Sequence, residues 1–292
     1  MRKISPRIDF AFKIIFERNT DLLMGLINAI VSEEDQVAEI EVRNPNNLKT
    51  GLKNKFSILD IKAKNVLGTW YTIEMQINND FDYLSRSLYY WSKVYVDQLK
   101  ESESYDKLNK VISIHLLNYT MDNDSASYHN VYQIRHEESH ELLTDALELH
   151  YVELPKVPED MKEIKTTLDR WATLLAKGEN YTLETLPKEL SSEALVKKAM
   201  AVFETTQFTE DEWMMYEARL KWARDEADIL RAKEKKAREE GEAIGIEKGE
   251  AIGIRKKAEE TAIKMHRLGM SDTEISDVSG LSVADIQTLM GK

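Results

Sequence analysis

The chain has 292 residues, of which 42% are hydrophobic, and its 52 acidic and 40 basic residues give a net charge of −12. This length is sufficient for one sizeable buried core with additional segments. The absence of cysteine excludes disulfide bonds, a thiolate nucleophile and zinc sites built from cysteine. Because the sequence has no apolar run of about 18 residues and its amino terminus mixes charged with apolar residues, we expect a cytoplasmic protein without membrane contact.

The negative charge is unevenly distributed along the chain. Residues 1–120 carry 16 basic and 16 acidic residues, so the whole excess of acid lies in residues 121–292. Within the neutral part, residues 43–64 contain six basic residues and one acid, Asp60. Such a positive segment would attract a polyanion, although a solvated lysine-rich loop explains the same composition.

The first elements are expected in the following order. Apolar residues at helical spacing predict a helix over residues 6–30, followed by a short strand at 40–43. Residues 56–64 and 69–77 each alternate between two faces and predict two strands joined by the turn "VLGT". If this turn is centred on Leu67, the two strands form an antiparallel hairpin in which paired residue numbers add up to 134.

This register places two carboxylates together. Asp60 lies opposite Glu74, with Cβ atoms about 5 Å apart on one face. Two like charges at this distance repel each other, and a magnesium ion, which takes carboxylate oxygens and substrate phosphate as ligands, would remove the repulsion. The same register pairs Lys62 with Thr72 and places Gln76 on the same face, so an amine and an amide flank the acids.

Three interpretations compete for this pair. On an exposed face, Lys62 and Lys64 would simply neutralise both acids. A retaining glycosidase also uses two carboxylates about 5 Å apart, but the lysine-rich surroundings suit an anionic substrate better. A metal-dependent nuclease uses the carboxylates, the amide and the lysines together, and we favour this interpretation because it accounts for more residues.

Further elements complete the expected sheet. Residues 81–99 predict a helix with a polar stripe and with an apolar stripe made of Leu84, Leu88, Trp91, Tyr95 and Leu99. Residues 111–119 are nearly continuously apolar and predict a central strand that contains His115 as a hydrogen-bonded core residue. Segments 131–135 and 147–154 are the remaining expected strands. In the first helix, Asp9 and Lys13 are one turn apart, which predicts an ion pair.

The rest of the chain is expected to be mainly helical. The segment "TEDE" at 209–212 is a capping box. Residues 241–256 repeat "GEAIGIEK" as "GEAIGIRK", and each of the four glycines weakens a helix by up to about 1 kcal/mol. This segment is therefore either a flexible tether or a helix that allows another helix to approach closely. Capping signals divide residues 257–292 into short helices. They carry too few basic groups for a recognition helix, and we expect a docking or dimer module.

Several runs together resemble one known family. They are "DFAFKIIF", "FSILDIKAKNVLGTWYTIEMQ", "RSLYYWSKVYVDQL", "YDKLNKVISIHLLNY", "YHNVYQIRHEES" and "LELHYVELPK". Over roughly residues 5–156 they resemble the Rpn (recombination-promoting nuclease) and transposase family of the PD-(D/E)XK nuclease superfamily. The resemblance implies an α/β fold of the restriction-endonuclease-like type, in which a mixed central sheet is flanked by helices and followed by a helical C-terminal region. We expect a nuclease-like domain at 1–156, a helical region at 157–240, a linker at 241–256 and a helical tail at 257–292.

The resemblance also implies site residues and an activity. The acidic metal ligands of the superfamily fall on Asp60 and Glu74, and its usual lysine falls on Gln76, so that Lys62 becomes the candidate for the missing positive charge. The implied activity is a DNA endonuclease linked to recombination or mobile elements. The implied cofactor is Mg²⁺ or another divalent cation such as Mn²⁺ or Ca²⁺. The alternative is a DNA-binding or scaffold protein that retains the fold without catalysis.

The remaining predicted contacts concern DNA and self-association. The candidates for contacts with the DNA backbone are Lys53, Lys55, Lys64, Arg86 and Tyr90. The accessory candidates are Asp9 and Lys13, on the first helix. We also expect a homo-oligomer formed through the C-terminal helical region.

Overall fold

The computed structural model describes residues 4–43, 61–78, 82–121 and 124–291. The chain divides into two compact units, Met1–Glu226 and Ala227–Lys292, and each is described by itself. Residues 157–226 thus belong to the same compact unit as the residues before them. The predicted domain boundaries at residues 156, 240 and 256 stay predictions.

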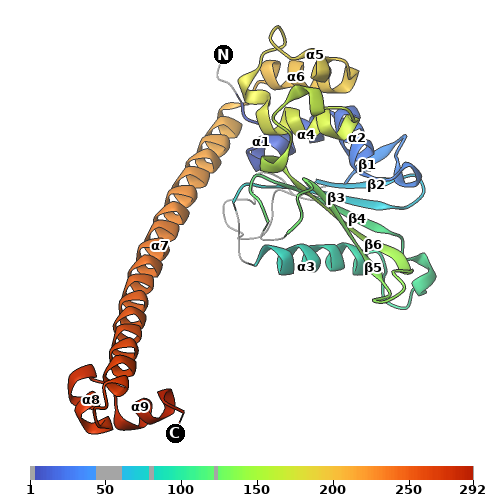
Figure 1. The fold of residues 1–292 in the computed structure, drawn as a ribbon. Helices are drawn as coiled ribbons and strands as arrows, with labels where there is room; N and C mark the ends of the chain where they lie inside the picture. The colour runs from blue at the N-terminus through green and yellow to red at the C-terminus, as the bar shows by residue number, and fades with distance from the viewer. Residues whose placement is uncertain (1–3, 44–60, 79–81, 122–123, 292) are drawn as a thin grey trace. The chain divides into compact units, whose positions relative to one another are not determined.

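The first unit is built on a mixed sheet, as predicted (Figure 1). Its strands are β1 (Ile40–Val42), β2 (Ile61–Asn65), β3 (Trp70–Gln76), β4 (Val111–Leu117), β5 (His129–Arg135) and β6 (Leu142–Glu153). They lie in the order β1-β2-β3-β4-β6-β5. The pairs β3–β4 and β4–β6 are parallel, whereas the other neighbours are antiparallel. Every residue of β4 is buried, which confirms the central strand that its continuous apolar run predicts.

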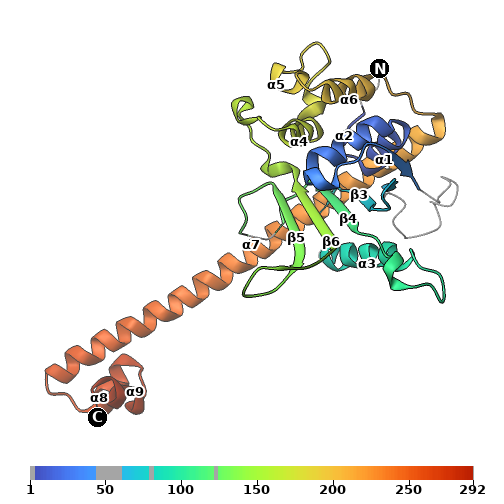
Figure 2. The same ribbon diagram turned by 90° about the vertical axis from the view of Figure 1, so that its right-hand side faces the viewer.

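Helices cover both faces of this sheet. The helices of the first unit are α1 (Asp9–Arg18), α2 (Thr20–Ile30), α3 (Tyr83–Val96), α4 (Thr167–Lys177), α5 (Lys188–Ser191), α6 (Ala194–Thr205) and the first part of α7 (Glu210–Arg267). Figure 2 shows α1 and α2 on one side of the strands and α3 on the other. Short 3₁₀ turns occur at Glu33–Asp35 (η1), Tyr105–Lys107, Leu154–Lys156, Met161–Glu163 and Gly178–Asn180. The main hydrophobic core lies on the α1 side, where α4 and α6 contribute Trp171 and Met200.

The prediction of one helix over residues 6–30 is wrong. The chain leaves the helical conformation at Asn19, whose φ of −128° and ψ of 76° lie outside the α region. The Asn19 side-chain amide instead donates to the carbonyl oxygen of Ile15 at 2.8 Å. Both resulting helices bury apolar residues in the same core. The apolar spacing therefore continues although the helix is interrupted at Asn19.

The β2–β3 hairpin has the predicted register. The pairs Lys62–Thr72 and Ala63–Tyr71 both have residue numbers that add up to 134. The turn contains Gly68 with a φ of +101°, a conformation that glycine adopts without steric cost. The carboxamide oxygen of Asn65 accepts hydrogen bonds from two backbone N–H groups of the turn. Local signals are thus sufficient to determine this hairpin.

The apolar stripe predicted on α3 is only partly covered, since Trp91, Tyr95 and Leu99 are half-buried. Leu84 and Leu88 are 51% and 47% exposed, whereas Tyr83, Ser87 and Val94 are buried. The sheet under α3 presents polar side chains, and hydroxyl groups of the helix bond to them. Because buried polar groups need hydrogen-bond partners, these contacts rotate the polar side chains toward the sheet and the leucines toward solvent.

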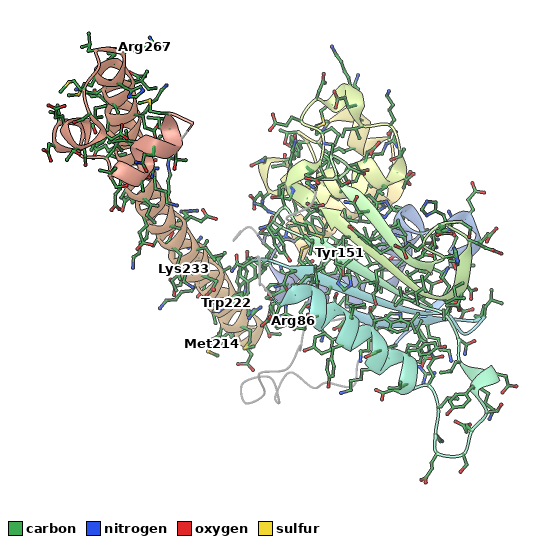
Figure 3. All side chains as sticks on the ribbon, turned by 60° about the horizontal axis from the view of Figure 1, so that its bottom comes forward. Arg86, Tyr151, Met214, Trp222, Lys233 and Arg267 are labelled. Carbon is green, nitrogen blue, oxygen red and sulfur yellow. The ribbon has the colours of Figure 1, made fainter. Side chains whose placement is uncertain are left out.

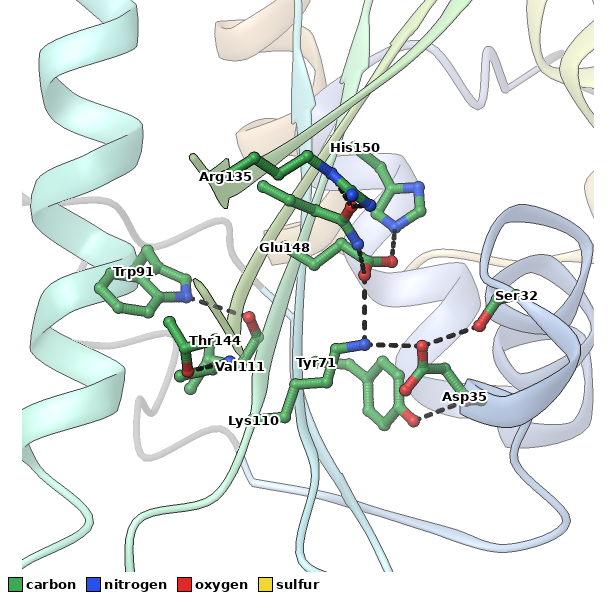
Figure 4. A network of polar contacts seen from close by, with 12 residues as sticks. Ser32, Asp35, Tyr71, Trp91, Lys110, Val111, Arg135, Thr144, Glu148 and His150 are labelled. Carbon is green, nitrogen blue, oxygen red and sulfur yellow. Dashed lines mark hydrogen bonds and ion pairs between the residues drawn. The ribbon is translucent and has the colours of Figure 1, made fainter. Parts of the chain in front are cut away.

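A polar network holds the other face of the sheet to η1 (Figure 4). Glu148 accepts hydrogen bonds from His150 at 2.7 Å, Gln133 at 2.9 Å and Lys110 at 3.1 Å. Lys110 also lies 2.7 Å from Asp35. The hydrogen bond from His150 is the main cause that lowers the pKa of Glu148 to about 2, against its desolvation. The network therefore joins β5, β6 and η1 through Lys110, the residue that precedes β4.

The second unit consists of the rest of α7 together with α8 (Asp272–Ser279) and α9 (Val283–Leu289). Residues 241–256 are helical within α7, which agrees with the helical alternative; the close approach of another helix to this segment stays a prediction. The predicted caps are confirmed, since Ser271 and Glu274 form a capping box and Gly280 ends α8 with a φ of 74°. Ala262, Ile275 and Ile286 form a small core. Among the described residues, none of the helices has both the length and the apolar character that membrane crossing requires.

Candidate active site

The candidate site lies on β3, on the side of the sheet that faces α3. Thr72, Glu74 and Gln76 alternate with the buried residues Ile73 and Met75, as the sequence predicts. The Thr72 hydroxyl donates to the Ser113 hydroxyl of β4 at 2.7 Å, which ties the two parallel strands together on this side. Figure 3 labels Arg86 on α3 and Tyr151 on β6, the elements that enclose the site.

Glu74 is held by two neighbours. The Tyr83 hydroxyl lies 3.3 Å from Glu74 Oε2 and 2.8 Å from His115 Nδ1. The distance from His115 Nδ1 to the same carboxylate oxygen is 3.9 Å. The Glu74 side chain is 12% exposed. The carboxylate is thus nearly buried and rests against a phenol and an imidazole.

His115 is neutral in this setting. Burial, with smaller contributions from the charges of His150 and Arg86, lowers its pKa to about 3. Its contact with Glu74 is therefore not an ion pair at neutral pH. The prediction that His115 is a hydrogen-bonded core residue is right for Nδ1 only, because the buried Nε2 has no hydrogen-bond partner among the described residues. The ring stacks on Tyr151, with centroids 4.7 Å apart.

Gln76 is oriented by Arg86. The Arg86 guanidinium donates to Gln76 Oε1 at 3.1 Å, and Gln76 Nε2 donates to the carbonyl oxygen of Asn78 at 3.0 Å. The same guanidinium lies over the Tyr83 ring, 5.1 Å from its centroid, in a cation–π contact. The structure thus brings Arg86 to the predicted site, and its contact with DNA stays a prediction.

The other predicted site residues are placed as follows. Lys62 is half-buried and pairs with Thr72 on the site face. Lys64 Nζ lies 5.2 Å from the centroid of the Trp70 ring, its cross-strand neighbour. The ring of Tyr90, on α3, packs edge-on against Tyr89. Asp60, Lys53 and Lys55 lie outside the described residues.

The predicted Asp9–Lys13 ion pair is wrong. Asp9 is buried and binds Arg219 of α7 through both carboxylate oxygens, with an Nε–Oδ1 distance of 3.1 Å. Lys13 lies 3.7 Å from Glu17 instead. Helical spacing predicts only local partners, whereas Arg219 is 210 residues away in the chain. Asp9 therefore ties α1 to α7 within the first unit.

The donor chemistry of the site fits a hard divalent cation. The Glu74 carboxylate and the Gln76 amide oxygen are ligands of the kind that Mg²⁺, Mn²⁺ and Ca²⁺ take. Tyr83 and His115 both lie against the Glu74 carboxylate and orient it. In the part of the chain that the structure describes, no group of three or more His, Cys, Asp and Glu side chains is arranged to hold a metal ion.

Sequence reasoning missed Tyr83 and His115 as neighbours of Glu74. In the sheet, His115 is the parallel cross-strand partner of Glu74. No turn connects β3 to β4 directly, so no local signal sets their register. The polar residues Ser113 and His115, on one face of an otherwise apolar strand, are the only hint within the sequence of β4 that this face meets polar groups.

The fold and the site together define a restriction-endonuclease-like α/β protein, with a carboxylate on a central strand of a mixed sheet. The family model of the PD-(D/E)XK nuclease family transposases matches residues 6–233. The chain belongs to this family. The match confirms the predicted resemblance and extends it from residue 156 through α4, α5, α6 and the start of α7. Neither a curated protein nor a solved structure matches the chain.

Proposed function

We propose that this protein is a metal-dependent DNA endonuclease that acts in recombination or in the movement of a mobile element. One observation carries the proposal beyond family membership. Lys62, Thr72, Glu74 and Gln76 share one face of the β2–β3 hairpin, in the register that predicts the Asp60–Glu74 pair. This arrangement supplies carboxylate, amide and amine groups to one surface.

The residues would act as follows. Glu74 and Asp60 would hold the cation, Mg²⁺ or another divalent ion such as Mn²⁺ or Ca²⁺. When bound, such an ion polarises the phosphate and lowers the pKa of a water molecule. Lys62 would place a positive charge near the charge that develops on the phosphate. Gln76, fixed by Arg86, would donate or accept a hydrogen bond there.

DNA would be held by its backbone. Lys53, Lys55 and Lys64 belong to the basic segment of the otherwise acidic chain, and Arg86 and Tyr90 lie on α3, next to the site. Contacts of this kind supply affinity without sequence preference. We propose a cytoplasmic location and self-association through the C-terminal helices as further properties of the protein.

Plasmid nicking tests the proposal. Wild type and the variants Asp60→Ala and Glu74→Ala are compared with and without Mg²⁺, and Glu41→Ala, on the exposed part of β1, is the control. We expect both site variants to lose at least about 100-fold in rate, because a bound metal supplies several kcal/mol of transition-state stabilisation. Equal nicking by Glu74→Ala and wild type contradicts the proposed mechanism.

A second candidate is a DNA-binding or scaffold protein without catalysis. Gln76 stands where the superfamily has a lysine, and a glutamine brings no positive charge to the site. The described contacts of its amide are with Arg86 and Asn78, and these observations favour the second candidate. DNA binding by the wild type without any nicking in Mg²⁺ or Mn²⁺ would support this candidate.

A further inference from the structure

A chain of hydrogen bonds runs behind the Glu74 carboxylate. It links His115 Nδ1, the Tyr83 hydroxyl and Glu74 Oε2 at distances of 2.8 Å and 3.3 Å. The rings of Tyr83 and His115 are both buried and lie edge to face, 5.6 Å apart. Tyr83 belongs to α3 and His115 to β4, so packing of the helix on the sheet creates this contact.

The positions of the protons follow from the available partners. If Tyr83 donated to His115 Nδ1, the imidazole proton would lie on Nε2, which is buried and has no acceptor among the described residues. A buried donor without an acceptor is costly. If Nδ1–H instead donates to the Tyr83 oxygen, the phenol proton points to Glu74 Oε2. Both protons then have acceptors, and the second bond is strengthened by the charge of the carboxylate.

We propose that Tyr83 and His115 are positioning residues, which hold the Glu74 carboxylate in the orientation that binds a divalent cation. This inference rests on the proposed function, in which Glu74 is a metal ligand. His115 donates from Nδ1 and turns the Tyr83 hydroxyl toward the carboxylate. The Tyr83 ring also supports the Arg86 guanidinium that orients Gln76, so one phenol serves both site residues. Partners of this kind fix the rotamer of a metal ligand.

The test compares two phenol hydroxyls in the same cluster. Tyr83 and Tyr151 are each 2% exposed and belong to one hydrophobic cluster, but the Tyr151 hydroxyl bonds to Ser87 at 2.8 Å. Titration with Mn²⁺ is followed by calorimetry for wild type, Tyr83→Phe and Tyr151→Phe. We expect Tyr83→Phe to weaken Mn²⁺ binding by about 10- to 100-fold and Tyr151→Phe to leave it unchanged. Wild-type affinity in Tyr83→Phe overturns the proposal, and so does equal weakening in both variants.

The proton assignment has a spectroscopic test. In metal-free wild type labelled with ¹⁵N-histidine, we expect a His115 signal typical of a protonated Nδ1 and a bare Nε2. A protonated Nε2 overturns the assignment. His115→Asn places an amide nitrogen near the position of Nδ1, whereas His115→Phe retains only the ring shape. The asparagine variant should therefore bind Mn²⁺ more tightly than the phenylalanine variant, and the reverse order overturns the role of His115.

One further variant separates this inference from the proposed function. Glu74→Gln removes the charge of the ligand itself and should abolish Mn²⁺ binding at the site. If Glu74→Gln binds Mn²⁺ as wild type does, the proposed metal site is wrong. If Glu74→Gln loses binding while Tyr83→Phe retains it, only the positioning role is wrong. Thermal unfolding of Tyr83→Phe and Tyr151→Phe checks that these two variants fold equally well.

Discussion

Asp9 and Arg219 form a buried ion pair whose two members should differ in importance. The Asp9 side chain is 3% exposed, whereas that of Arg219 is 29% exposed. Arg219→Met would leave a carboxylate buried without its cation, and removal of one partner of a buried pair costs about 3 kcal/mol or more. Asp9→Asn would leave a guanidinium that reaches solvent, so we expect a loss of about 1 kcal/mol.

Urea denaturation followed by tryptophan fluorescence measures these losses. The chain has five tryptophans, and all of them lie in the first unit, so the signal reports on that unit. With a urea dependence of about 2 kcal/mol per molar, Arg219→Met should lower the midpoint by about 1.5 M and Asp9→Asn by about 0.5 M. Asp21→Asn breaks an exposed pair with Lys198 and should shift it little.

The double variant and an activity assay complete the test. Asp9→Asn with Arg219→Met should cost less than the two single losses together, because the pair is broken only once. Additive losses, or a larger loss for Asp9→Asn than for Arg219→Met, would refute the asymmetry. If the role of Asp9 is structural, Asp9→Asn should nick DNA at the wild-type rate. A loss of nicking with an unchanged urea midpoint would instead support Asp9 as an accessory site residue.

Three further predictions follow from charge and domain structure. Replacing the lysines of the basic segment, Lys53, Lys55 and Lys64, by glutamine should flatten the salt dependence of DNA binding by up to about 0.9 per lost phosphate contact, and an unchanged slope would place DNA elsewhere. The pKa of Glu148 is lowered from 4.5 to about 2, so its stabilisation is complete above pH 4.5 and is lost as the pH falls toward 2; urea midpoints of Glu148→Gln should show a weaker pH dependence in this range. Truncation after residue 240 should retain magnesium-dependent nicking and reduce self-association in light scattering, and an unchanged oligomer would exclude the dimer module.

The sequence by itself determined the features that depend on neighbours in the chain. The β2–β3 register follows from two-residue alternation and a glycine turn, and the caps of α8 follow from a serine and a glutamate three residues apart. The continuous apolar run of β4 likewise marks a central strand. In the hairpin and the caps the interacting groups lie close together in the chain, so the sequence pattern contains their geometry. For β4 the pattern predicts burial on both faces but not the register with its neighbours.

Tertiary structure decided the contacts that join distant segments. The break at Asn19, the exposure of Leu84 and Leu88 on α3 and the pairing of Asp9 with Arg219 all differ from the local expectation. The neighbours of Glu74 come from α3 and from a parallel strand, and the sequence contains no turn that sets their register. The hydrogen bonds that orient a buried carboxylate depend on which elements pack over it. Buried polar groups find their partners across the whole core, so no single segment of the sequence specifies these bonds.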